Sequence, residues 1–263
     1  MVMKQSIRLA KSDVAVVLGC VIFMLANLGA VGTGGRERAK RSVCLSNLKQ
    51  LTLAWIMYAD DNNDKLVNGD TEEYGNFANQ TGAYAPGGYH YRERPWVLKD
   101  WQVYATLTQK RMAIEQGALF PYCKDVRLYK CPTIGPSDIR SCTFVDAMNC
   151  KGWDSKMVML KKRSQIKKPA ERFVFVDDGG TAGATMGGWT CYADRDEWWD
   201  PPPIHYNNGT NFSFADGHNE YWKWKDRRTV AFGKTGQAFS GPQPGNIDIR
   251  RTQVAAWGDA AIR

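Results

Sequence analysis

The clearest pattern along the chain is a pair of apolar segments near its N terminus. Residues 14–31 carry no charged side chain and only one strongly polar one, Asn27. At about 1.5 Å per residue, this run predicts a helix just long enough to cross a bilayer. After a glycine-rich break, apolar side chains recur at spacings of four and three, which predicts an amphipathic helix over residues 36–60. Its apolar face consists of Cys44, Leu48, Leu51, Trp55 and Tyr58.

Later in the chain, alternating patterns predict antiparallel strands. Residues 172–177 form an apolar, β-branched and aromatic run, and residues 210–215 and 218–224 flank Asp216 and Gly217. Asp-Gly between two alternating runs is a strong hairpin signal, because both central residues of the tight turn need a positive φ. We therefore predict a C-terminal antiparallel sheet in which Asp216 and Gly217 are structural turn residues.

The intervening sequence is less regular. Residues 66–100 are rich in Gly, Asn and Tyr and predict a long loop, and residues 101–117 have a helical pattern. The whole predicts an α+β fold, in which a long N-terminal helix, transmembrane in its first half and amphipathic in its second, packs on the C-terminal antiparallel sheet. The domains expected are a membrane anchor over residues 1–35 and a head over residues 36–263.

Composition and charge narrow the classes of function. A hydrophobic content of 43% with 12% aromatic residues is typical of a folded head and not of a disordered chain. The net charge of +8 is spread along the sequence, and no groove-reading or base-stacking motif accompanies it. We therefore expect no nucleic-acid partner.

The charges around the apolar run do not orient it. Lysine and arginine precede the run and also follow it, so the positive-inside rule is indecisive. A cleaved secretory signal peptide with a small-residue site at Leu28-Gly29-Ala30 is the alternative to an anchor. The helical pattern just beyond the run favours the anchor.

Three strings in the N-terminal region carry a resemblance to a known family. They are Arg38-Ala39-Lys40-Arg41, Cys44-Leu45-Ser46-Asn47-Leu48-Lys49-Gln50-Leu51 and Tyr58-Ala59-Asp60-Asp61-Asn62. Here the chain resembles bacterial type IV pilin-like proteins, with a closer match to pseudopilins similar to the major one of type II secretion. A Tyr-x-Cys-Pro segment at residues 129–132 is also similar to this group.

The chain departs from the family at the peptidase cleavage motif. The family's glycine followed by Phe-Thr-Leu-Ile-Glu is absent, and aligning the apolar runs places Arg8 at the glycine and Asp13 at the glutamate. The resemblance implies that Asp13 takes the role of the family's assembly glutamate. Arg36 and Arg38 are the other residues we expect at the contact between subunits.

A second resemblance lies near the C terminus. The group carries a processing-associated His-x9-Asp-Gly motif, to which the segment ending at Asp216 and Gly217 is similar. In this chain nine residues separate Tyr206 from Asp216, so Tyr206 stands at the position of the motif's histidine, and the histidine, His205, comes one place earlier. Either the motif has shifted, or Tyr206 replaces its histidine.

Together these resemblances imply a function. We expect a non-enzymatic pseudopilin-like subunit, anchored by one span in the bacterial inner membrane with its head in the periplasm, that contributes to a type II secretion-like or type IV pilus-like filament. Its partners would be other pilin-like subunits, the inner-membrane secretion machinery and membrane lipid. The alternative is a secreted or anchored tryptophan-rich module that binds carbohydrate or another ligand, since five of the ten tryptophans lie between residues 189 and 224.

No cofactor is expected, although two regions contain candidate cation ligands. The spacing of Asp60, Asn62 and Asp64 imitates the start of a calcium loop, but Lys65 and Thr71 stand where the loop needs glycine and glutamate, so a solvated helix end is favoured. A second candidate set could converge at strand ends as metal ligands or as an acid and base, although turn formation and capping are favoured for it. It consists of Asp177, Asp178, His205, Asp216 and His218.

Seven cysteines occur, at positions 20, 44, 123, 131, 142, 150 and 191. Cys20 lies in the apolar run, and the other six allow about 15 pairings, so their connectivity is not determined by the sequence. The pairs Cys123–Cys131 and Cys142–Cys150 would each close a short loop and are the pairings we predict. No Cys-x-x-Cys spacing is present, which disfavours a zinc site.

Overall fold

A computed structural model of the chain describes residues 10–29, 33–72, 78–99, 106–150, 159–178 and 188–259. The chain forms two compact units, Met1–Ala39 and Lys40–Arg263. We call the second unit the head. Helix α1 (Lys11–Gly29) belongs to the first unit, whereas helix α2 (Thr33–Asp61) begins in the first unit and continues into the head.

The prediction of a transmembrane anchor is wrong. None of the helices in the described part of the chain is both long and apolar enough to span a bilayer. Helix α1 starts with Lys11 and Asp13 and ends at Gly29. Its uncharged part, residues 14–29, measures about 24 Å, which is less than the roughly 30 Å of a hydrocarbon core. The same finding overturns the predicted localisation as a single-pass inner-membrane protein.

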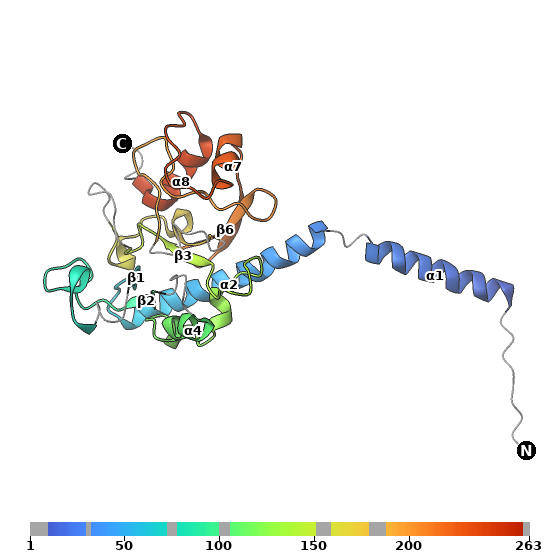
Figure 1. The fold of residues 1–263 in the computed structure, drawn as a ribbon, viewed down its shortest axis with the longest axis horizontal. Coiled ribbons are helices and arrows are strands. Elements are labelled where there is room, and N and C mark those ends of the chain that lie inside the picture. The colour runs from blue at the N-terminus through green and yellow to red at the C-terminus, as the bar shows by residue number, and fades with distance from the viewer. Residues whose placement is uncertain are drawn as a thin grey trace, which may run out of the picture. The chain divides into compact units, whose positions relative to one another are not determined.

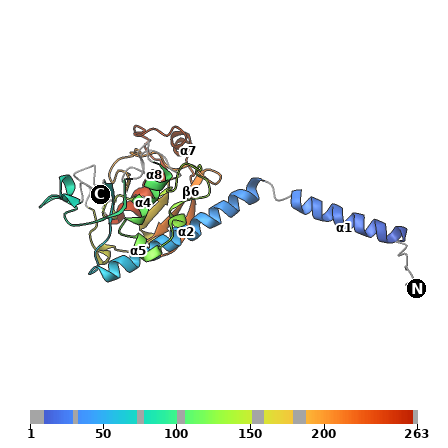
Figure 2. The same cartoon turned by 60° about the horizontal axis from the view of Figure 1, so that its bottom comes forward.

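The predicted apolar face of residues 44–58 lies in the core of the head. Cys44, Leu48, Leu51 and Trp55 are buried, and Tyr58 is partly buried. These side chains share one hydrophobic cluster with Phe144 and Phe175 of the sheet, whereas Leu53 and Met57 on the opposite side of α2 are exposed. Figures 1 and 2 show this part of α2 running along one side of the sheet.

The main sheet has five strands in the order β5-β3-β4-β6-β7. Neighbouring strands are antiparallel except for β5, which pairs with β3 in parallel. In chain order the strands are β3 (Cys142–Val145), β4 (Phe173–Asp177), β5 (Gly188–Trp189), β6 (Gly209–Phe214) and β7 (Asn219–Lys223). Strands β3 to β6 are buried throughout, because both faces of the sheet are covered.

The second face of the sheet packs against the C-terminal helices. Helices α7 (Arg227–Gly233) and α8 (Ile247–Trp257) lie on the side opposite α2 in Figure 1. A second hydrophobic cluster joins Ile249 and Ala256 of α8 to Phe173 and Phe212 of the sheet. Asn246 caps α8 by accepting hydrogen bonds from two backbone amides of its first turn.

The predicted long loop over residues 66–100 contains two short strands. Strands β1 (Asn68–Glu72) and β2 (Pro95–Leu98) pair in parallel as a separate two-stranded sheet. The next helix is α4 (Leu107–Glu115), which starts with a capping box formed by Thr106 and Gln109. The predicted helix start at residues 101–105 lies outside the described residues. The short helices are η1 (Gly82–Tyr84), α5 (Phe120–Cys123), η2 (Val126–Tyr129), η3 (Arg163–Gln165) and η4 (Pro169–Glu171).

The predicted hairpin is formed by β6 and β7, with a turn that differs from the predicted one. The amide of Gly217 donates to the carbonyl of Phe214, so Ala215 and Asp216 occupy the central positions of the turn. Of these turn residues only Gly217 has a positive φ, +95°. Asp216 accepts a hydrogen bond from the amide of His218 and stabilises the turn from its side chain.

The fold class predicted from the sequence is also wrong. The chain is a mixed α/β protein, and no long apolar helix is present among the described residues. The expected long N-terminal helix is two helices, α1 and α2, and the sheets include the parallel pairs β1–β2 and β3–β5. Parallel pairs need crossover connections between distant segments, which local hydrophobic patterns do not reveal.

Candidate functional site

Four motif segments of the sequence meet at one point in the head. Cys44 comes from α2, Cys131 follows η2, Asp177 ends β4, and Tyr206 precedes β6. The Sγ atoms of the two cysteines and a carboxylate oxygen of Asp177 all lie within 4.8 Å of one another. We call these four residues the thiol cluster.

Hydrogen bonds connect the members of the thiol cluster. The Cys44 thiol donates to Oδ2 of Asp177 over 2.9 Å, and the Tyr206 hydroxyl donates to the same oxygen over 3.2 Å. The Tyr206 hydroxyl also lies 2.5 Å from Sγ of Cys131. Oδ1 of Asp177 is buried and has no hydrogen-bond partner among the described residues. The cluster thus has one oxygen acceptor in excess.

The Tyr206 side chain is positioned by a backbone turn that is conformationally unfavourable. Tyr206, Asn207 and Asn208 all have positive φ, which is unfavourable for an aromatic residue such as Tyr206. The Tyr221 hydroxyl donates to the carbonyl of Tyr206 and braces this turn. Tyr206 therefore provides the hydroxyl group that reaches Asp177 from this turn.

Burial raises the pKa values of two members of the thiol cluster, Cys44 and Tyr206. It raises the pKa of the Cys44 thiol well above its ordinary value, and the neighbouring Cys131 and Asp177 raise it further. Burial and the charge of Asp177 likewise raise the pKa of the Tyr206 hydroxyl. The Cys44 thiol and the Tyr206 hydroxyl therefore keep their protons near neutral pH, which disfavours nucleophilic catalysis by Cys44.

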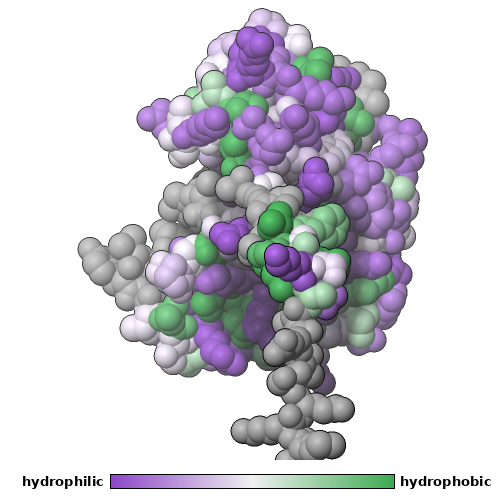
Figure 3. Space-filling model, turned by 90° about the vertical axis from the view of Figure 1, so that its right-hand side faces the viewer, coloured by the Kyte–Doolittle hydropathy of each residue, from purple (hydrophilic) through white to green (hydrophobic). Residues whose placement is uncertain are grey.

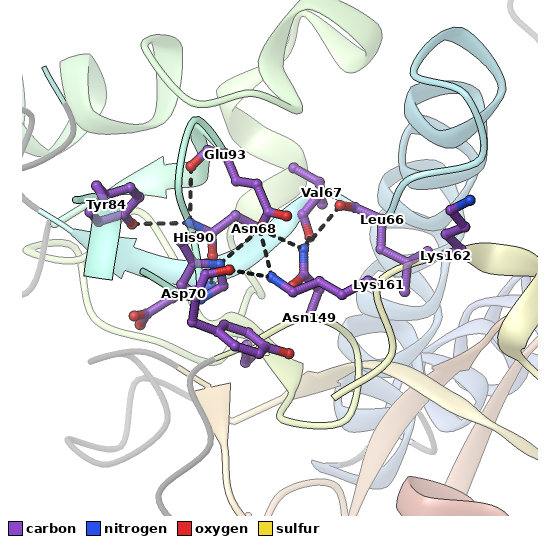
Figure 4. Close-up of polar contacts among 12 residues, drawn as sticks. Leu66, Val67, Asn68, Asp70, Tyr84, His90, Glu93, Asn149, Lys161 and Lys162 are labelled. Carbon is purple, nitrogen blue, oxygen red and sulfur yellow. Dashed lines mark hydrogen bonds and ion pairs between the residues drawn. The ribbon is translucent and has the colours of Figure 1, made fainter. Parts of the chain in front are cut away.

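A second polar cluster surrounds Glu93 in the loop before β2 (Figure 4). Oε2 of Glu93 lies 2.9 Å from Nδ1 of His90 and accepts a hydrogen bond of 2.9 Å from Nζ of Lys161. Asn149 donates to the carbonyls of Leu66 and Val67 and to the same carboxylate. Figure 4 shows Asn149 and Lys161 pointing toward the loop that carries Glu93, which is how this loop is fastened to the rest of the head.

The charges of the Glu93 cluster satisfy one another. Burial alone would raise the pKa of Glu93, but the hydrogen bonds from His90 and Lys161 hold it below its usual value. Lys161 also donates to the carbonyl of Tyr89 and lies 3.6 Å from the centroid of that ring. Since Lys161 has two hydrogen-bond acceptors and also contacts the face of the Tyr89 ring, the cluster is organised as a structural ion pair and not as a base awaiting a substrate.

Two further carboxyl groups are buried near β5. Burial raises the pKa of Asp200 to about 7, although hydrogen bonds from Thr190 oppose this shift. Burial also raises the pKa of Asp146 well above its ordinary value, and the nearby Asp200 adds to the effect. Neither carboxylate oxygen of Asp146 has a hydrogen-bond partner within the part of the chain that the structure describes. A protonated Asp146 is the form that this environment favours.

The second predicted cation set is not brought together. Asp177 and Asp178 are buried at the end of β4, next to the start of β6, where Thr210 donates to the Asp177 carbonyl. Asp216 and His218 pair with each other at the opposite end of β6, beyond Phe214, where their side chains are 35% and 37% exposed. His205 pairs with Gly209 through its backbone.

The carboxylates of the calcium-like segment are paired with an arginine. Arg163 forms ion pairs with Asp60 and Asp64, and Asp64 also accepts a hydrogen bond from the amide of Ser164. The side chain of Asn62 donates to the carbonyl of Tyr58. This segment therefore acts as the polar end of α2, attached to η3.

All seven cysteines lie in described residues and are free thiols. The predicted pairs Cys123–Cys131 and Cys142–Cys150 are not bonded in this structure. Cys131 has Cys44 as its neighbour, and Cys123 lies 3.4 Å from the Tyr129 hydroxyl instead. The thiol of Cys142 is directed to the carbonyl of Tyr129.

The predicted assembly residues lie in the first unit and are solvent-exposed. Asp13 is in the first turn of α1, where its carboxylate accepts a hydrogen bond from the amide of Ala10. Arg36 and Arg38 are in the first turns of α2. Between these charges, α1 exposes a series of large apolar side chains. They are Val14, Val16, Val17, Leu18, Val21, Ile22, Phe23 and Met24.

The head surface differs from α1 in this respect. On the face drawn in Figure 3, hydrophilic residues predominate over the head and hydrophobic residues are scattered among them. Large exposed apolar residues of the described head are few and dispersed, such as Leu107, Ile247 and the pair Leu53 and Met57 on α2. Isolated apolar residues of this kind are normal on a protein surface, whereas the series on α1 is not.

Sequence reasoning identified the motif segments but not the clusters they form. Cys44, Cys131, Asp177 and Tyr206 were all singled out, yet no sequence pattern links them. The Glu93 cluster was missed, because its residues lie in a region that predicts an irregular loop. Comparison of the chain with protein-family models, curated proteins and solved structures found no match.

Proposed function

We propose that the chain is a non-enzymatic, pseudopilin-like structural subunit that joins copies of itself into a filament through α1. The observation that carries this proposal is the exposure of the large apolar side chains of α1. At 100° per residue, residues 14–24 distribute these side chains around the whole circumference of the helix. A helix that is apolar all round needs an apolar environment on every side.

Other copies of α1 are the partner that fits these residues best. A bundle of α1 helices would bury the apolar side chains, and it requires no helix that crosses a membrane. Asp13 before the apolar series and Arg36 after it supply opposite charges at its two ends. A copy displaced along the helix axis could pair Asp13 with Arg36 of its neighbour. A repeated displacement of this kind gives an open helical assembly.

Burial of the polar clusters supports a non-enzymatic role. Cys44 and Cys131 are each 2% exposed and Asp177 is fully buried, so a substrate has no access to the thiol cluster. Tryptophan burial weakens the case for the ligand-binding alternative, because these side chains build the core. The buried ones are Trp55, Trp96, Trp189, Trp198, Trp224 and Trp257.

Sedimentation velocity and negative-stain electron microscopy of the full chain test the proposal. We expect large species whose share rises with protein concentration. Ile22→Asp, at a side chain that is 63% exposed on α1, should shift the protein to monomer. Leu107→Asp is the matched control: Leu107 is 53% exposed in the first turn of α4, where an aspartate is favourable for the helix.

Exchanging the two charges tests the proposed contact between Asp13 of one copy and Arg36 of its neighbour. Asp13→Arg and Arg36→Asp should each weaken assembly, and the double variant should restore it, because the attraction is preserved with reversed sign. If the parent chain stays monomeric at every concentration, the filament proposal is wrong. Equal loss of assembly in Ile22→Asp and Leu107→Asp would also contradict it.

A further inference from the structure

The thiol cluster has the composition of a metal site. Two cysteine sulfur atoms, a carboxylate and a phenol oxygen converge from four segments in the interior of the head. Within the described residues, no lysine, arginine or histidine forms an ion pair with Asp177. A buried carboxylate with one unpartnered oxygen and no cation is costly, and such groups are usually paired or coordinate a metal.

We infer that Cys44, Cys131, Asp177 and Tyr206 bind one zinc ion. Zn²⁺ accepts sulfur and oxygen ligands in a tetrahedral arrangement, and soft thiolates select it over magnesium and calcium. The two thiols would lose their protons to solvent as the Zn–S bonds form. Asp177 would supply a carboxylate oxygen, and the Tyr206 hydroxyl oxygen would complete the set. The ion would offset most of the negative charge of the two thiolates and the carboxylate.

The distances suit this assignment after a small adjustment. In a tetrahedral site with Zn–S of about 2.3 Å and Zn–O of about 2.1 Å, neighbouring ligand atoms lie about 3.4–3.8 Å apart. The ligand atoms of Cys44, Cys131 and Asp177 lie within 4.8 Å of one another, and the hydrogen-bonded Cys44–Asp177 pair is closer, at 2.9 Å. Side-chain shifts of about 1 Å would admit the ion.

The position of the ligands indicates what the ion does. All four are protein side chains, and a closed set of four protein ligands is typical of a structural zinc site. The ligands join α2 to the loop after η2, to the end of β4 and to the turn before β6. Zinc would therefore fasten α2 to the sheet of the head, independently of whether α1 mediates assembly.

Metal binding by the purified, reduced full chain tests this inference. After incubation with Zn²⁺ and removal of excess metal, elemental analysis should find one zinc ion per chain. Co²⁺ in place of Zn²⁺ should produce a sulfur-to-cobalt charge-transfer absorption, which reports thiolate ligation directly. This spectrum needs no variant, so it stays decisive even if a substitution impairs folding. Its absence would overturn the inference.

Variants identify the ligands. Cys131→Ser should abolish the charge-transfer band and stoichiometric zinc, and Asp177→Asn should weaken zinc affinity by at least about tenfold. Cys191→Ser is the matched control, because Cys191 is equally buried but lies in the other hydrophobic cluster. Equal zinc affinity of the parent and Cys131→Ser would contradict the assignment. A metal-free parent with two fewer free thiols and a Cys44–Cys131 disulfide would contradict it as well.

Discussion

Residues 14–24 of α1 and residues 44–55 of α2 are both rich in large apolar side chains, yet their environments are opposite. On α1 the apolar side chains are exposed around the helix, whereas Leu48, Leu51 and Trp55 of α2 are buried against the sheet. The side chains differ little in chemistry, so the difference comes from what surrounds each helix. An apolar helix indicates that a partner is needed, and only the fold shows whether the same unit supplies it.

Among these variants, the largest loss in the free energy of unfolding is expected at the buried Trp55. Trp55→Ala removes a fully buried side chain from the cluster beneath the sheet and should lower the free energy of unfolding by about 3–5 kcal/mol. Leu53→Ala, at a 46% exposed position of the same helix, should change it by less than about 0.5 kcal/mol. Urea denaturation of both variants measures this difference. Similar losses in the two would mean that α2 does not pack on the sheet as described.

Burial also affects polar residues, because it changes the pKa of buried carboxyl groups and so makes stability depend on pH. Asp200 has a pKa of about 7 in the folded head against an ordinary value of 3.8. Between these values the unfolded chain is ionised while the folded chain keeps the proton, so stability falls as pH rises. The contribution of Asp200 to this slope should be about 1.4 kcal/mol per pH unit, and it should vanish below about pH 4 and above about pH 7.

Denaturation across this pH window tests the role of Asp200. Asp200→Asn should be less sensitive to pH than the parent, with the residual slope coming from Asp146. Asp13→Asn is the control, because Asp13 is exposed on α1, and it should keep the slope of the parent. A parent whose stability rises between about pH 4 and pH 7 would contradict the protonated state assigned to these carboxyl groups.

The smallest expected effect of a substitution on stability lies at the turn of the β6–β7 hairpin. A Cβ at Gly217 would meet only Cδ1 of Ile56, at an ordinary 3.7 Å, so a substitution there acts through backbone strain. With φ at +95°, Gly217→Val should lower the free energy of unfolding by more than about 1 kcal/mol. Gly217→Asn should cost less, since asparagine tolerates positive φ better. Thermal melts of both variants distinguish strain from lost packing, which would affect them equally.

Local chemistry in the sequence determined several elements directly. The spacing of Leu48, Leu51 and Trp55 indicates one buried helical face, and the alternation around Asp216 and Gly217 indicates a hairpin. Both features depend on residues a few positions apart, so neighbouring side chains carry the information. Even here the turn differed in detail, because Ala215 and Asp216 take its central positions and only Gly217 needs a positive φ.

Other features were decided only by the tertiary structure. Whether the apolar run of residues 14–31 spans a membrane depends on where its helix ends, and α1 ends at Gly29. The parallel pairing of β5 with β3 and the meeting of Cys44, Cys131 and Asp177 join segments that are far apart in the sequence. The hydrophobic periodicity and the turn residues can be read within a single segment. Which strands pair, and which distant side chains come into contact, depends on how all segments pack together. The sequence therefore supplied the members of the thiol cluster, and the fold alone brought them together.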